Sequence, residues 1–221
     1  HQLAAKGARA ADSPAELVAM LTAPRIVWLM LPSGDATREH IGLFAELLSA
    51  GDILVDGSNS SFKDDEIHHR YLKKNNIRYL DAGVSGGIWG LENGYCTMVG
   101  GDRDDFEYIE PLLKTLAPEK GYLYCGPSGA GHFTKMIHNG IEYAMMQAYG
   151  EGFALLDSSP YREHVKLDEI AALWNRGSVI RSWLLELLEA ALADEDTLEG
   201  LEPFVDDSGE GRWTIMQAIE S

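Results

Sequence analysis

The sequence predicts a doubly wound α/β sheet followed by an all-helical domain, and two observations predict this fold class. Up to residue 126, short apolar segments alternate with helical stretches of roughly a dozen residues, as in sheets whose parallel strands are joined by crossover helices. From residue 132 onward the apolar residues follow the helical period, and no segment has the pattern of a strand. We therefore expect two domains, residues 1–126 and residues 127–221.

In the first domain, each element is predicted from its apolar pattern and its end signals. The sequence opens on the last turns of a helix that ends at Gly7, and a short helix runs from Pro14 to about Leu21 behind the capping residue Ser13. Right-handed crossovers are expected between strands that are separated by helical stretches of about a dozen residues. The predicted strands are residues 25–31, 53–56, 77–84, 94–100 and 121–125, and the longer helices are residues 36–49, 64–75 and 102–116.

The second domain is predicted to begin with a long helix over residues 132–157, which is the least polar helix and is therefore expected in a helical core. The acidic stretch 190–202 is most simply a solvated loop or helix end. Residues 213–220 begin a further amphipathic helix. Because the sequence starts and stops inside helical patterns, we expect the first domain to be incomplete at its N-terminal end and the second at its C-terminal end.

The composition limits the class of protein. The 221 residues are 45% hydrophobic and 24% charged, which is typical of globular domains. A formal net charge of −17 disfavours nonspecific binding to nucleic acid, and the apolar runs are too short to span a membrane. No signal peptide opens the sequence, and Cys96 and Cys125 lack a CxxC spacing. We expect buried structural thiols and a cytoplasmic protein with no nucleic-acid or membrane partner.

A polar stripe on the long helix is the most informative pattern for chemistry. Lys135, His138, Asn139 and Glu142 are spaced i, i+3, i+4 and i+7, which places them on one face of the helix. Lys135 and Glu142 are two turns apart, roughly 10 Å. They form either a structural network or an acid–base pair that works on opposite ends of a small molecule, and His138 is either a catalytic or a hydrogen-bonded core residue.

Three polar turns follow predicted strands and are expected at one edge of the sheet, where open α/β sheets bind ligands. The first two turns fit either an anion site or a strand-terminal turn that needs positive φ angles. The third, least specific turn is Leu31–Gly34. The first two are the run from Asp56 to Ser61, which contains Asn59, and the run from Asp81 to Gly87, which contains Ser85 and Gly86.

Arginines in the second domain are candidates for binding phosphate. Arg176, Arg181 and Arg212 are flanked by glycine and tryptophan in an otherwise acidic sequence. A guanidinium group binds phosphate through two parallel hydrogen bonds, although surface ion pairs are its more common fate.

Taken together, these motifs resemble the 6-phosphogluconate dehydrogenase family, of the β-hydroxyacid dehydrogenase superfamily, over nearly the whole sequence. The run His-Asn-Gly-Ile-Glu-Tyr, residues 138–143, is similar to the family's catalytic helix. Relatives that act on hydroxyisobutyrate-like acids share the Val-Ser-Gly-Gly turn but typically follow the lysine with paired asparagines. The Asp-Ser-Gly-Glu-Gly-Arg run, residues 207–212, resembles the short-chain bacterial branch. The resemblance implies a Rossmann-like first domain that binds the dinucleotide and a helical second domain for substrate and dimerisation.

The resemblance also implies an activity, the oxidative decarboxylation of 6-phosphogluconate to ribulose 5-phosphate in the pentose phosphate pathway, without a metal. Lys135 is then the general base for the C3 hydroxyl, and Glu142 is the acid that protonates the enediol. The residues implied for the sugar-acid end are Asn59, Ser85, Gly86, Gly87, His138 and Asn139. The residues implied for the phosphate end are Tyr143, Arg181 and Arg212, and Arg212 stands where long-chain members usually have a lysine. The residues implied for the nicotinamide site are Leu31, Pro32, Ser33 and Asn59.

Two further departures from the family pattern concern the cofactor. Ile88 follows the Ser-Gly-Gly turn where long-chain members often place an acidic residue, and the Gly-rich pyrophosphate turn is not in this sequence. Either NAD or NADP is therefore expected, with NAD favoured by analogy to short-chain relatives. The resemblance also implies a homodimer or homotetramer. Two alternatives remain open, another NAD(P)-dependent β-hydroxyacid dehydrogenase and a noncatalytic metabolite-binding fragment.

Overall fold

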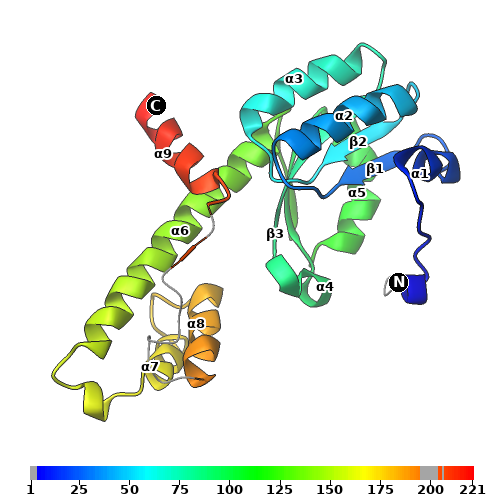
Figure 1. Cartoon of the computed structure of the whole chain (residues 1–221). Helices are drawn as coiled ribbons and strands as arrows, with labels where there is room; N and C mark the ends of the chain where they lie inside the picture. Colours follow the sequence, from blue (N-terminus) through cyan, green and yellow to red (C-terminus); the bar gives the residue numbers. More distant parts are fainter. Residues whose placement is uncertain (1–3, 195–203, 206) are drawn as a thin grey trace. The chain divides into compact units, whose positions relative to one another are not determined.

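The computed structural model describes residues 4–194, 204–205 and 207–221. It forms two compact units, His1–Ile137 and His138–Ser221, which are described separately below (Figure 1). Helix α6 (Ala130–Asp157) begins in the first unit and ends in the second.

The first unit follows the predicted order of elements, beginning with the 3₁₀ helix η1 (Ala4–Lys6). Ser13 caps α1 as expected, because its hydroxyl accepts a hydrogen bond from the Glu16 N–H at 3.2 Å. The remaining elements are α1 (Pro14–Met20), β1 (Ile26–Leu29), α2 (Asp35–Leu47), β2 (Ile53–Asp56), α3 (Phe62–Lys73), β3 (Arg78–Ser85), η2 (Gly87–Trp89), α4 (Gly90–Asn93), β4 (Cys96–Gly101), α5 (Arg103–Leu116) and β5 (Tyr122–Gly126).

The five strands form one sheet in the order β1-β2-β3-β4-β5, which confirms the predicted fold class. Strands β1, β2 and β3 are parallel, with Asp56 opposite Asp81 at the end of their shared register. Strand β4 runs antiparallel to β3, at the connection for which the sequence predicts no helix of crossover length. Only residues 86–95 join these two strands, and a parallel crossover needs a dozen residues or more. The short connection therefore reverses the chain.

Helices cover both faces of this sheet, as the ribbon in Figure 1 shows. Helices α1, α2 and α3 bury their apolar side chains on one face, where Ile41 and Phe44 pack with Leu29, Leu54 and Leu72. On the other face of the sheet, α5 packs its apolar side chains against the side chains of β2, β3 and β4 that point to that face. That second core contains Ile53, Val55, Leu80, Val99, Phe106, Ile109 and Leu113. This two-sided burial is the property that the predicted apolar strands required.

All elements of the second unit in the described part of the chain are helical. They are the C-terminal part of α6, η3 (Arg162–His164), α7 (Leu167–Trp174), α8 (Trp183–Asp194) and α9 (Glu210–Glu220). Their small core contains Phe153, Leu167, Ala171, Leu185 and Leu192. The first residues of the predicted acidic stretch continue α8, and the rest, residues 195–202, lie outside the described residues.

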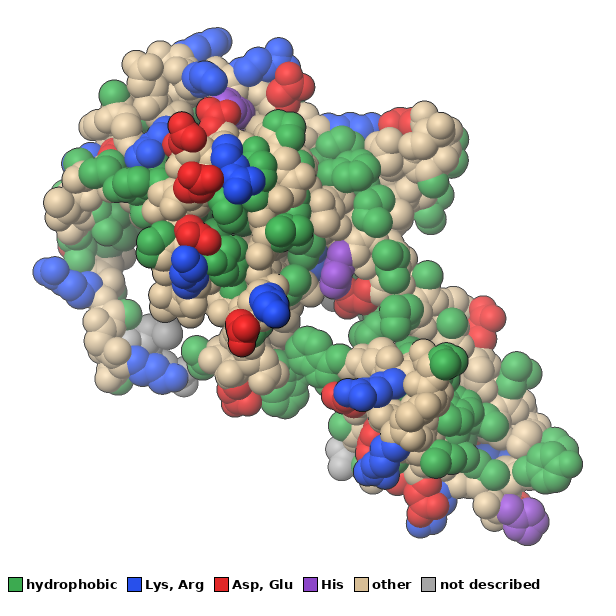
Figure 2. Space-filling view, turned by 180° about the vertical axis from the view of Figure 1, so that it is seen from behind, with side chains coloured by type: hydrophobic (Ala, Val, Ile, Leu, Met, Phe, Trp, Pro, Cys, Tyr) green, Lys and Arg blue, Asp and Glu red, His purple; other side chains and the backbone are tan. Residues whose placement is uncertain are grey.

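The surface departs from the expectations from composition at one cysteine. No helix in the described ranges is long and apolar enough to cross a membrane. On the face seen in Figure 2, basic side chains lie among acidic ones rather than in one basic patch. Cys96 and Cys125 are free thiols, but Cys96 is exposed and Cys125 is half-buried. The expectation of buried structural thiols is therefore wrong for Cys96, which stands at the first position of β4, a strand otherwise buried.

Candidate active site

The ends of β1 and β2 are joined by hydrogen bonds at the carboxyl edge of the sheet. The Leu31 N–H donates to the hydroxyl of Ser58 at 3.2 Å, and the Gly57 N–H donates to the Leu29 carbonyl at 2.9 Å. The predicted cofactor residues Leu31, Pro32 and Ser33 follow β1 directly, and Pro32 and Ser33 are exposed there. The turns after these two strands therefore form one continuous rim.

Asn59 joins the end of β2 to the end of β3. Its side-chain oxygen accepts a hydrogen bond from the Val84 N–H at 2.8 Å, and its amide nitrogen donates to the Val84 carbonyl at 3.1 Å. The residue has a φ angle of 53°, a conformation that asparagine tolerates better than most side chains. The prediction that two polar turns lie side by side at neighbouring strand ends is confirmed.

The glycine turn after β3 has the conformation that its sequence requires. Ser85 is the last residue of β3, and Gly86 and Gly87 have φ angles of 143° and 52°. The structural explanation for these glycines is therefore correct, although it does not exclude ligand binding by the same turn. Asp81 differs from expectation because it lies inside β3 and not after it.

Lys135 lies against β3 at a point where no side chain interrupts the packing. A Cβ atom on Gly83 would overlap the Cβ atom of Lys135 and lie 2.9 Å from the Gly131 carbonyl oxygen. A Cβ atom on Gly131 would in turn lie 2.7 Å from the backbone nitrogen of Gly100 on β4. Lys135 is only 5% exposed. Gly83 and Gly131 therefore allow the start of α6 to approach the sheet closely. This close approach is next to Val84, the residue whose backbone Asn59 binds.

A buried network supports this part of the site and was not predicted from the sequence. The Asp81 carboxylate accepts hydrogen bonds from the backbone N–H groups of Gly129 at 2.7 Å and His132 at 3.0 Å, which caps the start of α6. One turn before Lys135, Nδ1 of His132 lies 2.9 Å from the Asp65 carboxylate. Asp65 also accepts a hydrogen bond from the Tyr79 hydroxyl at 2.7 Å.

The two ionisable partners of this network have shifted pKa values. Burial raises the pKa of Asp65 to about 7, although the facing His132 acts in the opposite direction. Burial alone would lower the pKa of His132, but the Asp65 carboxylate, with Asp56 and Asp81, raises it to about 9. The pair fixes α6 to α3 from inside the unit. The sequence signal that could have suggested the Asp65–His132 pair is the position of His132, three residues before Lys135.

Two groups of these buried side chains also have a geometry that a metal ion could accept. They are Asp56, Asp65 and His68, and Asp65, Asp81 and His132. The carboxylates already accept hydrogen bonds, those of Asp56 from the Ser58 N–H at 2.9 Å and the Ser60 hydroxyl at 2.8 Å. Their contacts are those of a structural network that holds the Asn59 turn and the start of α6.

In the second unit, the last three residues of the predicted polar stripe form a connected cluster. Nδ1 of His138 lies 2.9 Å from the side-chain oxygen of Asn139 and 3.6 Å from a carboxylate oxygen of Glu142. Asn139 is buried, whereas the side chains of His138 and Glu142 are 39% and 37% exposed. The stripe therefore runs from the interior of this unit to its surface. The amide of Asn139 also donates to Glu210, a buried residue that sequence analysis did not single out.

Tyr143 and Arg212 line one pocket of about 730 Å³ in the second unit, together with Thr214 at its α9 side. Arg212 also lies 3.1 Å from Asp207. Arg181 is exposed and precedes α8, and it is not among the residues that line this pocket. The structure thus brings together two of the three side chains expected at the phosphate end.

Two family models match the chain. The model described as the NAD binding domain of 6-phosphogluconate dehydrogenase matches residues 1–126, and the model of the 6-phosphogluconate dehydrogenase C-terminal domain matches residues 131–221. The chain belongs to the 6-phosphogluconate dehydrogenase family. The resemblance identified from the sequence is therefore confirmed.

Individual members of the 6-phosphogluconate dehydrogenase family are similar over nearly the whole chain. The Bacillus subtilis protein YqeC is 44% identical over 99% of this chain and 73% of its own length. An NAD(+)-dependent, decarboxylating 6-phosphogluconate dehydrogenase of Haloferax volcanii is 42% identical over 97% of this chain and 71% of its own.

A solved structure extends the similarity to three dimensions. The Plasmodium falciparum 6-phosphogluconate dehydrogenase, determined in its apo form and with NADP+ and 6-phosphogluconate, is 31% identical with a TM-score of 0.84. The similar region covers 94% of this chain and 46% of that chain, so this chain spans about half of the longer enzyme.

Proposed function

We propose that this protein catalyses the oxidative decarboxylation of 6-phosphogluconate to ribulose 5-phosphate and carbon dioxide, with hydride transfer to NAD or NADP, as in the pentose phosphate pathway. One observation carries the proposal. Helix α6 presents a buried lysine, Lys135, and then the cluster of His138, Asn139 and Glu142 on the same helical face. Family membership supports the same reaction, because the Haloferax relative is named a decarboxylating 6-phosphogluconate dehydrogenase and the Plasmodium relative is a 6-phosphogluconate dehydrogenase with 6-phosphogluconate as its substrate.

Lys135 is proposed as the general base. Burial disfavours the charged ammonium form, so a lysine in this position can release its proton and accept one from the C3 hydroxyl of the substrate. Oxidation at C3 gives a β-keto acid, which loses carbon dioxide as the C1–C2 electron pair moves toward the new carbonyl. The protonated Lys135 would then donate a hydrogen bond to that carbonyl oxygen and stabilise the enolate.

Glu142 is proposed as the acid for the last step. Its carboxyl group is partly exposed and lies two turns along α6 from Lys135, roughly 10 Å along the helix axis. The C3 oxygen and the carbon that lost the carboxylate are neighbouring positions of the substrate, so the side chains of Lys135 and Glu142 would converge on them from two turns of α6. The lysine would act at the C3 oxygen while the glutamate donates a proton to the neighbouring carbon.

The remaining site residues are proposed to hold the two ends of the substrate. The sugar-acid end would bind to the turn residues of the first unit, where backbone N–H groups and side-chain hydroxyl and amide groups suit a carboxylate and hydroxyls. The phosphate end would bind at the pocket of Tyr143 and Arg212, with Arg181 as a further contact. The residues proposed for the sugar-acid end are Asn59, Ser85, Gly86 and Gly87 of these turns, together with His138 and Asn139 of α6.

The carboxyl edge of the sheet fits a nicotinamide dinucleotide. Leu31, Pro32 and Ser33 offer backbone groups and a hydroxyl at the end of β1, and the Thr37 hydroxyl holds the Pro32 carbonyl at 2.9 Å. An apolar pocket of about 390 Å³ in the same unit suits a flat ring and is lined by Trp28, Met30, Val84, Tyr95, Thr97, Leu112 and Leu116. When bound, the nicotinamide would accept the hydride from C3. NAD is favoured by the Haloferax relative, and NADP is the cofactor of the Plasmodium enzyme.

The assembly and location of the protein are proposed on the same basis. We propose a dinucleotide-binding domain over residues 1–126, a helical substrate domain over residues 127–221, and a homodimer or homotetramer formed through the helical domain. Exposed apolar side chains on α6 and α9 support an assembly surface, among them Ile141, Leu155, Ile215 and Ile219. The free thiols of Cys96 and Cys125 fit a reducing, cytoplasmic compartment.

Substitution of the two arginines tests the phosphate requirement. Arg212→Gln should raise the KM for 6-phosphogluconate by about 10- to 100-fold, because a charge-assisted hydrogen bond to phosphate is lost. Arg181→Gln should have a measurable but smaller effect, since Arg181 does not line the pocket. Arg70→Gln, at an exposed arginine of α3, is the matched control and should leave KM unchanged.

Three other outcomes would each contradict the proposal. An unchanged KM in the Arg212 variant would remove the phosphate site from this pocket. Equal activity on unphosphorylated gluconate would instead favour another β-hydroxyacid dehydrogenase. Binding of 6-phosphogluconate without any dinucleotide binding by calorimetry would favour a noncatalytic metabolite-binding protein.

A further inference from the structure

Glu210, the first residue of α9, is a buried acidic residue whose contacts lead to the proposed substrate residues. Glu210 is only 5% exposed. The amide nitrogen of Asn139 donates a hydrogen bond to its Oε2 atom, and the Ser208 hydroxyl lies 3.4 Å from the same oxygen. A buried carboxylate is costly unless hydrogen-bonded, so these contacts account for its position.

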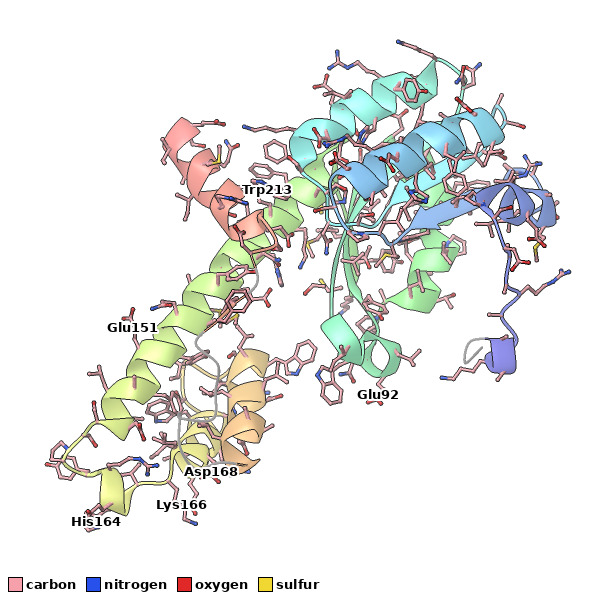
Figure 3. All side chains as sticks on the ribbon, in the orientation of Figure 1. Glu92, Glu151, His164, Lys166, Asp168 and Trp213 are labelled. Atoms are coloured by element: carbon pink, nitrogen blue, oxygen red, sulfur yellow. The ribbon has the colours of Figure 1, made fainter. Side chains whose placement is uncertain are left out.

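The packing of α9 on α6 keeps this contact in place (Figure 3, where Trp213 marks α9). Gly209 precedes Glu210 in the left-handed conformation, with a φ angle of 90°. A Cβ atom on Gly140 would lie 2.7 Å from Oγ1 of Thr214, so the first turn of α9 packs directly on the α6 backbone beside Asn139. The glycine in the His-Asn-Gly run is therefore required by the approach of α9.

The carboxylate determines which way the Asn139 amide faces. A carboxylate only accepts hydrogen bonds, so the amide nitrogen of Asn139 must face Glu210 and the amide oxygen must face away from it. That oxygen lies 2.9 Å from Nδ1 of His138, nearer than the Glu142 carboxylate oxygen at 3.6 Å, which is also an acceptor. Because an amide oxygen also only accepts, Nδ1 of His138 must carry the proton in this hydrogen bond. In the neutral ring, the lone pair is then on Nε2.

We propose that Glu210 is a positioning residue that fixes the Asn139 amide and, through it, the Nδ1–H tautomer of His138. Its consequence for binding rests on the proposed function, since His138 and Asn139 are proposed to hold the sugar acid. A ring with its lone pair on Nε2 accepts a hydrogen bond from a substrate hydroxyl, whereas the other tautomer would donate one there. Glu210 thus selects the hydrogen-bonding character of His138 without touching the substrate.

Two variants of Glu210 separate this role from simple packing. Glu210→Gln keeps an oxygen that accepts from Asn139, whereas Glu210→Met has a similar size and no such acceptor. The ¹⁵N chemical shifts of the His138 ring report its tautomer directly when they are measured at a pH where the ring is neutral. The wild-type protein and Glu210→Gln should both show the Nδ1–H form. Glu210→Met should shift the ring toward the Nε2–H form, because the released Asn139 amide can turn over.

Asn139→Ala provides a second route to the same test if Glu210→Met does not fold. Removing the amide should release the Nδ1–H preference of His138, and adding Glu210→Met to Asn139→Ala should have no further effect on the tautomer. Persistence of the Nδ1–H form in both single variants would overturn the proposal. So would a further tautomer change in the double variant, because Glu210 would then act on His138 by another route.

Calorimetric titration with 6-phosphogluconate connects the tautomer to binding. Glu210→Met should raise the Kd about tenfold and Glu210→Gln by less than about twofold, as expected for one hydrogen bond at a polar site. An unchanged Kd in Glu210→Met, together with a changed tautomer, would remove the consequence for binding. Absence of binding by the wild-type protein would count against the proposed function alone, because the tautomer measurement uses no substrate.

Discussion

Gly83 of β3 and Lys135 of α6 are packed so closely that no Cβ atom on the glycine can be accommodated. The atom would overlap the Cβ of the lysine and would lie 2.9 Å from the carbonyl oxygen of Gly131, one turn earlier in α6. Asn59 holds the next residue of β3, Val84, through both of its backbone groups. The proposed base therefore depends for its position on a glycine in the strand beneath it.

Gly83→Ala should displace the start of α6, because backbone and not only a flexible side chain opposes the added methyl group. We expect a loss of stability of about 1–3 kcal/mol and a large loss of turnover, measured by urea unfolding and steady-state kinetics. Gly42→Ala in α2 is the matched control, since nothing lies within 4 Å of its added Cβ atom. That variant should be stabilised by up to about 1 kcal/mol with normal turnover. Normal turnover in Gly83→Ala would disprove the dependence.

Lys135→Met should abolish turnover while substrate binding is largely kept, because the proposed base acts in the transition state. Met is similar in length to the lysine stem and is compatible with the 5% exposure of the site. Kinetics and calorimetry on the same preparation separate the two effects. Turnover within about tenfold of the wild type would exclude Lys135 as the base.

Glu142→Gln should cause a smaller but clear loss of turnover. The variant keeps the size and partial exposure of the side chain but cannot supply the proton for the last step. Hydride transfer should be less affected than product formation, which single-turnover measurements of both products would reveal. Identical rates for the variant and the wild type would rule out this role.

The Asp65–His132 pair should make stability depend on pH. The folded-state pKa of His132 is raised from 6.5 to about 9, so its contribution is fully present below pH 6.5 and is lost as the pH rises through 9. The folded-state pKa of Asp65 is raised from 3.8 to about 7, so this group lowers the free energy of unfolding progressively as the pH rises from 3.8 to 7. Between pH 7 and 9 the free energy of unfolding should therefore fall, by at most about 1.4 kcal/mol per pH unit.

The double variant Asp65→Asn, His132→Gln isolates this effect, because it removes both titrating groups and keeps their shapes. Urea unfolding at several pH values from 7 to 9 should show a decline for the wild type and a flatter dependence for the variant. An equally steep decline in both proteins would assign the pH dependence to other groups.

Much of the fold followed from local signals in the sequence, and the exceptions have physical causes. Ser13 caps α1, and β2 spans the predicted residues 53–56. The reversal of β4 was missed because hydrophobic periodicity carries no strand direction. Only the short connection, residues 86–95, determines the direction of β4.

The candidate site was predicted where a motif is contiguous and missed where tertiary packing brings residues together. The spacing from Lys135 to Glu142 placed four side chains on one helical face. Nothing local indicates that Asn139 meets Glu210, 71 residues later, or that Asp65 meets His132, 67 residues later. The sequence around Gly83 is that of an ordinary strand, and only the packing of α6 against it excludes a side chain at this position.

The most direct test of the proposed reaction is the stoichiometry of carbon dioxide released to nicotinamide reduced, with 6-phosphogluconate and with NAD and NADP in parallel. The account predicts reduction of at least one cofactor, with one carbon dioxide and one ribulose 5-phosphate formed for each hydride transferred. Reduction without carbon dioxide release, or no reduction with either cofactor, would contradict it.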